Sequence, residues 1–137
     1  DNTNFGDAVA TSKNNSSSMD SFAGGLVGQF ALGGNADDVG SVSLPSNKTF
    51  GYVCSTGRAG LLFGAAAYNC YASILIRKSV VGGAIKGTVN SGAEVTHTDK
   101  VEITSKNFAD NLWSYRKDTV TQLKIENTTF GRAEDYR

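Results

Sequence analysis

Few side chains in this sequence are of a type that could do chemistry. The 137 residues include two cysteines, Cys54 and Cys70, and a single histidine, His97. The cysteines form no CxxC motif, and one histidine cannot complete a zinc site with them. We interpret the cysteines as small apolar side chains buried on neighbouring strands, with a disulfide as the alternative, because an exported chain permits one. His97 lies in an alternating segment, where a position on a strand surface is expected.

The acidic residues form no obvious catalytic pair. Asp37 and Asp38 are adjacent, as are Glu134 and Asp135, and adjacent residues of a strand point to opposite faces. Neither pair therefore makes an acid–base couple. The sequence has no G-x-S-x-G elbow, and its glycine runs neither precede Lys-Ser/Thr nor open a helix. We predict a protein that is not an enzyme and that uses no cofactor or metal.

Aromatic residues are the remaining candidates for a binding function. Tyr71, Trp113 and Tyr115 could stack on sugar rings or on a protein partner. In a glycine-rich sheet, however, an aromatic ring more often packs over a glycine that leaves room for it. A carbohydrate platform built from these three residues is therefore an alternative interpretation and not the leading one.

The composition indicates one strand-rich domain. A chain of 137 residues corresponds to one domain, and its 16 glycines with a single proline are typical of strands joined by tight turns. Basic and acidic residues number 13 each, so the charge balance favours no nucleic-acid partner. No apolar run approaches the ~20 residues of a membrane helix, and no signal peptide is visible. Because the sequence opens as if within a repeat array, we expect a fragment of a longer exported protein.

One short glycine-bounded segment occurs twice. GGLVG at residues 24–28 is followed by GLLFG at residues 60–64, at an offset of 36 (60 − 24 = 36). Apolar residues between glycines favour a short buried strand, and glycine lets a neighbouring backbone approach closely. Recurrence at a fixed offset is the mark of a solenoid. We therefore predict that Leu26 and Leu62 are equivalent residues stacked in one core, with a β-sandwich as the alternative architecture.

These segments resemble the GLUG repeat of bacterial surface proteins. That repeat reads roughly GGLVG, a short turn and an NCYATG-like strand, and here GLLFG is followed by NCYAS at residues 69–73. VGGAIKG at residues 81–87 resembles the strand that closes such arrays, and NFADNL at 107–112 resembles the segment that follows them. The resemblance covers about residues 20–112. The residues that carry the motif are Gly24, Gly25, Leu26, Val27, Gly28, Gly60, Leu62, Phe63, Gly64, Asn69, Cys70 and Tyr71.

The resemblance implies an adhesin-like architecture of stacked β coils, exposed at the cell surface or secreted. It implies a host or matrix glycan or protein as the partner, and it carries over no catalytic residue. The leading hypothesis is a non-catalytic surface module that serves as a scaffold or spacer in cell adhesion. The alternative is a carbohydrate-binding module that uses exposed Tyr and Trp side chains.

Local patterns predict the individual elements. Alternating apolar and polar residues predict strands at 4–11, 22–32, 39–44, 49–54, 60–67, 70–78, 80–89, 94–98, 100–104, 121–126 and 128–131. A turn is expected at 55–58. Phe108, Leu112 and Trp113 recur at helical spacing, and with Ser105 as N-cap they predict a short helix over 105–113. Residues 134–137 are expected to fray. The prediction is one all-β domain over residues 1–137 with a single short helix.

Overall fold

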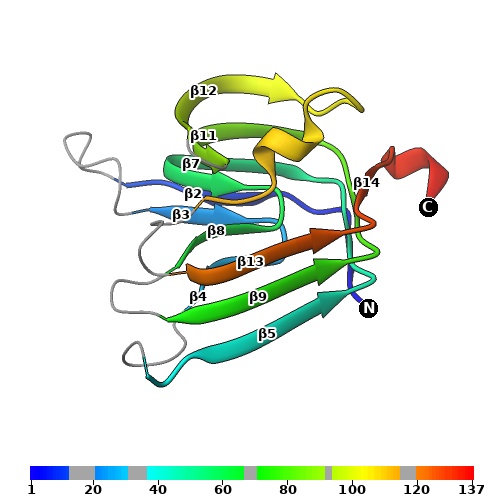
Figure 1. Cartoon of the computed structure of the whole chain (residues 1–137). Coiled ribbons are helices and arrows are strands. Elements are labelled where there is room, and N and C mark those ends of the chain that lie inside the picture. The colour runs from blue at the N-terminus through cyan, green and yellow to red at the C-terminus, as the bar shows by residue number, and fades with distance from the viewer. Residues whose placement is uncertain (13–20, 31–36, 67–70, 92–93, 115–119) are drawn as a thin grey trace.

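The computed structural model in Figure 1 describes residues 1–12, 21–30, 37–66, 71–91, 94–114 and 120–137. Strands dominate this part of the chain, so the all-β prediction is confirmed. Its helical structure consists of two short 3-10 segments, η2 (Phe108–Asn111) and η3 (Ala133–Asp135). Neither of these has the length and apolar character that a membrane-crossing helix requires.

The described strands form four sheets. The first contains β1 (Thr3–Asn4), β6 (Lys48–Thr49), β10 (Val80–Val81) and β14 (Thr129–Phe130), in that spatial order. The second contains β12 (Glu94–Glu102), β11 (Ala84–Ser91), β7 (Tyr52–Gly60) and β2 (Ala8–Ala10), and β3 (Phe22–Gly24) also pairs with β7. The third contains β13 (Val120–Glu126), β9 (Ala72–Arg77) and β5 (Gly40–Pro45), and the fourth contains β4 (Val27–Phe30) and β8 (Phe63–Ala66).

The chain runs through these sheets repeatedly in one direction. Every strand pairing in the described residues is parallel except that of β11 with β12. We call residues 3–45, 48–77 and 80–126 the first, second and third pass. The five strands of the first pass each pair with a strand of the second pass. Figure 1 shows the result in the third sheet, where β5, β9 and β13 lie side by side.

The apolar core lies inside the sheets and is most completely buried in the second pass. Strand β9 alternates, with Ile74 and Ile76 at 1% and 0% exposure and Leu75 half-buried on the other face, as its sequence predicts. Ile76 pairs with Leu44 of β5 and with Ile125 of β13, and both of these are only half-buried. Side chains of the second pass thus have core neighbours on both sides, and those of the outer passes have them on one.

Single left-handed residues turn the chain from the third sheet into the first. Ser46, Lys78 and Asn127 follow β5, β9 and β13, with φ values of 58°, 54° and 49°. This conformation costs most residues roughly 1–2 kcal/mol, although Asn tolerates it. Beside this corner, the buried Asn47 side chain accepts hydrogen bonds from the backbone and side-chain nitrogens of Asn2, at 3.0 and 3.1 Å. A single residue with a left-handed backbone conformation therefore recurs at each of the three corners.

Two local predictions were wrong because strand pairing overrides local propensity. The expected turn at 55–58 lies inside β7, which runs unbroken for 9 residues. β2 pairs with β7 up to Ser55 and β3 pairs with it from Arg58 onward, while the register against β11 shifts between Cys54 and Arg58. The predicted turn therefore coincides with an irregularity inside a continuous strand. Thr98 and Asp99 likewise do not end β12, although its register against β11 shifts between Thr98 and Val101.

The predicted short helix over 105–113 is confirmed only in part, because within that range only the four residues of η2 form a 3-10 helix. The N-cap position is Asn107 and not Ser105, and the Asn107 side chain closes a turn instead. Its oxygen accepts from the Thr104 N–H at 2.8 Å, and its nitrogen donates to the Glu102 carbonyl at 2.9 Å. Further on, Leu112 is the C-cap of η2, and its carbonyl accepts the Leu62 N–H of the second pass at 2.8 Å.

Candidate functional site

The two glycine-bounded segments lie beside each other in the register that their spacing predicts. Gly24 pairs with Gly60 and Val27 with Phe63, and both pairs differ by 36 residues. The Leu26 N–H donates to the Leu62 carbonyl at 3.0 Å. Leu62 is fully buried and Leu26 is half-buried against the same core. The prediction that these leucines are equivalent is confirmed, and Leu26 is less buried than expected.

A third copy of this segment lies in the third pass, and sequence reasoning missed it. The Leu62 N–H donates to the Leu112 carbonyl at 2.8 Å, and the Ser114 N–H donates to the Phe63 carbonyl at 3.1 Å. Phe63 and Trp113 form a parallel bridge. The shared signal is a leucine, a larger or branched apolar residue and a small residue, as in LVG at 26–28, LFG at 62–64 and LWS at 112–114.

Glycine at position 60 is required by this stacking. A Cβ there would lie 2.1 Å from the Phe63 carbonyl oxygen and 2.8 Å from the Trp113 Cα. Backbone atoms cannot yield at such distances, so the approach of the second and third passes depends on the missing side chain. Gly60 thus serves packing between passes.

The predicted ligand-stacking residues are not gathered in one described place. Trp113 is half-buried and packs against the core next to Phe63. Tyr71 is half-buried, and its carbonyl accepts the Gly40 N–H at 2.9 Å. Tyr115, and the motif residues Asn69 and Cys70, lie outside the described residues.

An aromatic stack that the sequence did not suggest lies at the corner between the first and second sheets. The Phe5 and Phe50 rings are stacked with centroids 5.4 Å apart, and the Tyr136 ring stacks on Phe50 at 5.1 Å. The Arg137 guanidinium lies 5.0 Å from the centre of the Phe5 ring. The expectation that residues 134–137 fray is therefore wrong, because stacking fixes the C-terminal residues onto the side of the fold.

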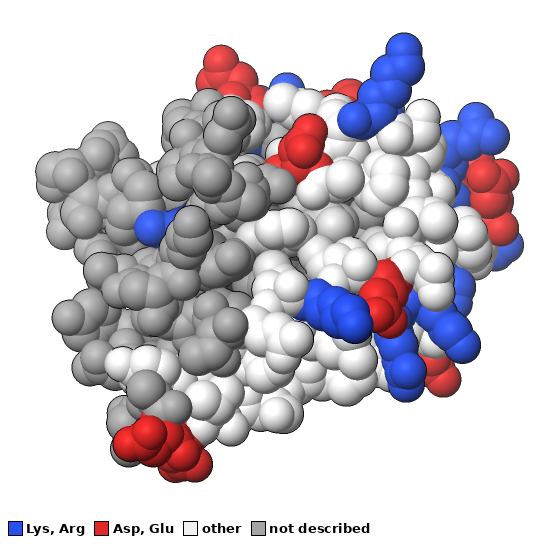
Figure 2. All heavy atoms as spheres, viewed as in Figure 1, with Lys and Arg blue, Asp and Glu red and all other residues white. Residues whose placement is uncertain are grey.

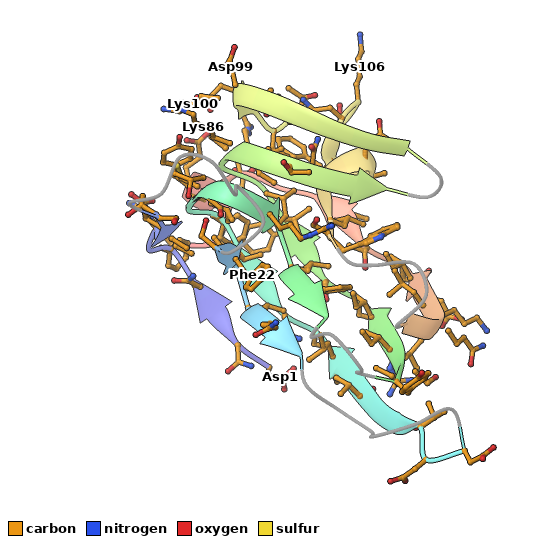
Figure 3. The ribbon with its side chains drawn as sticks, turned by 90° about the vertical axis from the view of Figure 1, so that its left-hand side faces the viewer. Asp1, Phe22, Lys86, Asp99, Lys100 and Lys106 are labelled. Atoms are coloured by element: carbon orange, nitrogen blue, oxygen red, sulfur yellow. The ribbon has the colours of Figure 1, made fainter. Side chains whose placement is uncertain are left out.

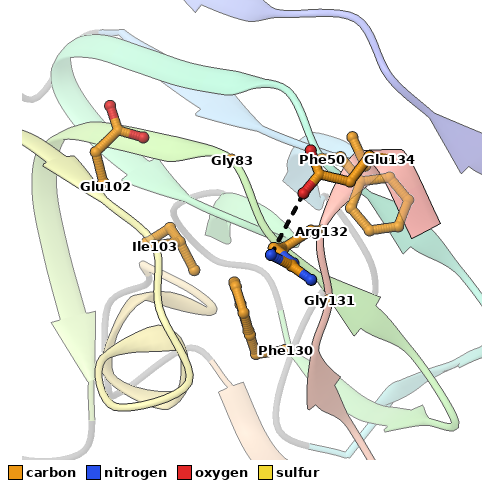
Figure 4. A pocket seen from close by; sticks show the side chains of 9 residues that line it. Phe50, Gly83, Glu102, Ile103, Phe130, Gly131, Arg132 and Glu134 are labelled. Atoms are coloured by element: carbon orange, nitrogen blue, oxygen red, sulfur yellow. Dashed lines mark ion pairs between the residues drawn. The ribbon is translucent and has the colours of Figure 1, made fainter. Parts of the chain in front are cut away.

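The C-terminal segment also lines one side of an open hollow of about 250 Å³. Figure 4 shows Ile103 and Phe130 inside this hollow, with Glu102 and Glu134 at its edges. Arg132 pairs with Glu134 at 3.5 Å, and both side chains are largely exposed to solvent. The remaining lining residues are Phe50, Gly83, Gly131 and Ala133. Two aromatic rings, Phe50 and Phe130, thus lie together with charged side chains around this hollow.

Cys54 differs from its predicted position. It carries a free thiol and is half-buried, whereas its neighbours Val53 and Ser55 are each 2% exposed. The strand alternation therefore turns Cys54 outward on the face of β7, beside Tyr52. Cys70 is outside the described residues.

The outward face around Cys54 is polar and charged. The Asp7 side chain accepts the Tyr52 N–H at 2.8 Å, and the Lys100 ammonium lies 5.0 Å from the centre of the Tyr52 ring. A hydrogen bond to Cys54 is the main cause that raises the pKa of Tyr52 to about 12, and burial and the negative charges of Cys54 and Asp7 add to it. Figure 3 shows Lys86 and Lys100 projecting from this side of the molecule. The Tyr52 phenol therefore stays protonated here across the physiological range.

The described residues hold no group of three or more His, Cys, Asp or Glu side chains placed to bind a metal ion together. His97 lies in β12 with its backbone opposite Thr88. Comparison with family models, with curated proteins and with solved structures gave no match.

Proposed function

We propose that this chain is a non-catalytic β-solenoid module, and that it serves as an adhesin-like scaffold or spacer at the cell surface. Each pass of the chain is one coil of the solenoid in this proposal. The observation that carries it is the in-register stacking of equivalent residues along the third sheet, where Val42, Ile74 and Leu123 lie in one row. The left-handed corner residues and the glycine-bounded segments recur in the same order from coil to coil.

The mechanism of such a module is mechanical. Hydrogen bonds between parallel strands run along the stack, and successive coils are spaced by roughly 4.8 Å. The stacked apolar rows hold the coils together, and Phe5, Phe50 and Tyr136 add a stack of rings at one corner. A rod built in this way keeps its length and resists proteases, which are the properties that a surface spacer needs.

Single-molecule pulling of the chain from both ends tests this role. We expect resistance to extension and stepwise lengthening, with each step releasing about one coil. Proteolysis without force should leave the second coil intact for longest, because it has neighbours on both sides. Extension at negligible force in one smooth event would contradict a mechanical role.

Carbohydrate binding is the second candidate function, and the hollow at the C-terminal segment favours it. Phe130 offers a ring, and Glu102, Arg132 and Glu134 offer hydrogen-bonding groups around it. A glycan array should then give binding that Arg132→Ala abolishes and Lys106→Ala leaves unchanged, since Lys106 is exposed and absent from the lining. Equal binding by the two variants would exclude this site as the sugar platform.

A further inference from the structure

We propose that the side of the coils around Phe5 and Phe50 is a docking site for a peptide that carries a tyrosine followed directly by a basic residue. In this structure residues 132–137, which we call the C-terminal segment, occupy the site as an intramolecular ligand. The proposal goes beyond the scaffold role and does not depend on it. Its basis is a row of rings that the segment continues, and the small number of contacts that hold the segment in place.

Equivalent positions on the four strands of the first sheet carry two aromatic rings and then two glycines. These positions directly follow β1, β6, β10 and β14, and they are Phe5, Phe50, Gly82 and Gly131. The N–H groups of the last three each donate to a carbonyl of the preceding strand in the sheet, at 3.0, 2.9 and 3.0 Å. The row is therefore in register, and its two glycines contribute no side chain to it.

The Tyr136 ring fills the space that the row leaves beside Phe50. The two rings stack with centroids 5.1 Å apart and an interplanar angle of 23°, close to the 5.4 Å and 22° between Phe5 and Phe50. A Cβ on Gly131 would lie 2.9 Å from a carbon of the Tyr136 ring, so the missing side chain makes room for this ring. Phe50 is 6% exposed with the ring in place. The site thus holds a ring that comes from a different part of the chain.

The polar contacts of the C-terminal segment lie within the segment itself. Arg132 pairs with Glu134 at 3.5 Å and with Asp135 at 3.6 Å, and the Tyr136 N–H donates to the Ala133 carbonyl at 3.0 Å. Figure 2 shows basic and acidic atoms together at the right-hand edge, where Figure 1 places this segment. The paired side chains are 64%, 71% and 56% exposed, so these ion pairs contribute little to stability.

Two adjacent side chains therefore attach the segment to the coils. Tyr136 stacks on Phe50, and the Arg137 guanidinium lies 5.0 Å from the centre of the Phe5 ring. A tyrosine and an arginine of another chain can make the same stacking and cation–π contacts. The site thus recognises an aromatic ring followed directly by a cation, and a peptide with this pair of side chains is the ligand that fits it.

The tethered segment competes with any free peptide for this site. It directly follows β14, so its effective concentration at the site is high, on the order of millimolar. A free peptide of the same sequence should therefore bind the unchanged chain weakly. It should bind more tightly once the two attaching side chains of the segment are removed.

NMR titration of the isotope-labelled chain with the unlabelled peptide GRAEDYR, the sequence of residues 131–137, tests this proposal. We expect the Tyr136→Ala/Arg137→Ala chain to bind the peptide at least several-fold more tightly than the unchanged chain, with shifts at the Phe50 amide. Replacing the tyrosine of the peptide by alanine should weaken binding roughly 2- to 10-fold, through loss of one stacking contact. The matched control is Glu134→Ala/Asp135→Ala, which removes exposed charges of the same segment and should bind like the unchanged chain.

A second measurement covers the case in which the Tyr136→Ala/Arg137→Ala chain fails to fold. Excess peptide should then displace the segment of the unchanged chain, and the Tyr136 ring signals should lose the shifts that stacking on Phe50 imposes. Unmoved Tyr136 signals in that case would overturn the proposal. So would equal affinity of the folded variant and the unchanged chain, or binding that does not depend on the tyrosine of the peptide.

Binding of cellobiose by the Tyr136→Ala/Arg137→Ala chain, without binding of the peptide, would assign the site to sugar rings and overturn the peptide assignment. The scaffold proposal is tested separately by pulling, so failure here leaves it standing.

Discussion

Replacing Gly64 by alanine tests how closely the first and second passes are packed. Gly64 and Gly28 occupy the same position in the two glycine-bounded segments, 36 residues apart (64 − 28 = 36). A Cβ on Gly64 would lie 2.5 Å from the Ala23 carbonyl oxygen and 2.8 Å from the Ala23 nitrogen. A Cβ on Gly28 would meet only the Phe22 carbonyl oxygen, at 3.4 Å. The two substitutions are chemically identical and differ in what surrounds them.

The expected difference is large for so small a change. Overpacking against backbone that cannot move costs typically 1–3 kcal/mol, so Gly64→Ala should lower the free energy of unfolding by about that amount. The φ of Gly28 is not in the left-handed range. Gly28→Ala should therefore be neutral or stabilise by roughly 0.4–1 kcal/mol, because alanine restricts the unfolded chain.

Urea denaturation followed by circular dichroism and by the fluorescence of Trp113 measures both variants. Trp113 is the single tryptophan, and it sits beside Phe63, one residue from the substituted position. In thermal unfolding, Gly64→Ala should lose roughly 4–12 °C in Tm. Equal free energies of unfolding for Gly64→Ala and Gly28→Ala would refute the argument from close packing.

Three further predictions concern a corner, the aromatic stack and the tyrosine on β7. Lys78→Asn should stabilise the fold by about 0.5–1 kcal/mol in urea denaturation, because the left-handed conformation at φ 54° disfavours lysine and suits asparagine; a loss of stability would contradict this. Tyr136→Ala should destabilise by roughly 0.5–1.5 kcal/mol through loss of stacking on Phe50, whereas Glu134→Ala, on an exposed pair, should change little. The raised pKa of Tyr52, about 12 against a usual 10.0, means that the folded state holds this proton more tightly than the unfolded chain. The contribution of the Tyr52 proton to the free energy of unfolding is therefore complete below pH 10 and is lost as the pH rises to about 12. Cys54→Ala should lower the pKa of Tyr52 in a spectroscopic titration of tyrosinate.

The sequence determined those features that depend on neighbours along the chain or on a constant spacing. The two-residue alternation of ASILIR in β9 correctly separated buried Ile74 and Ile76 from half-buried Leu75. The offset of 36 residues between the two glycine-bounded segments became their pairing register. This register could be predicted from the sequence because parallel strands without an insertion between their paired positions keep the same residue offset along their length.

Only the tertiary structure decided the features that depend on register between distant segments. The copy at 112–114 follows its partner by 50 residues (112 − 62 = 50), because the hairpin of β11 with β12 lengthens the third pass, and the fixed offset disappears. Alternation along β7 could not say that Cys54 faces outward, since a period of two residues leaves the choice of face open. Phe5, Phe50 and Tyr136 share no local pattern, and their rings meet only because the passes stack and the C-terminal segment folds back.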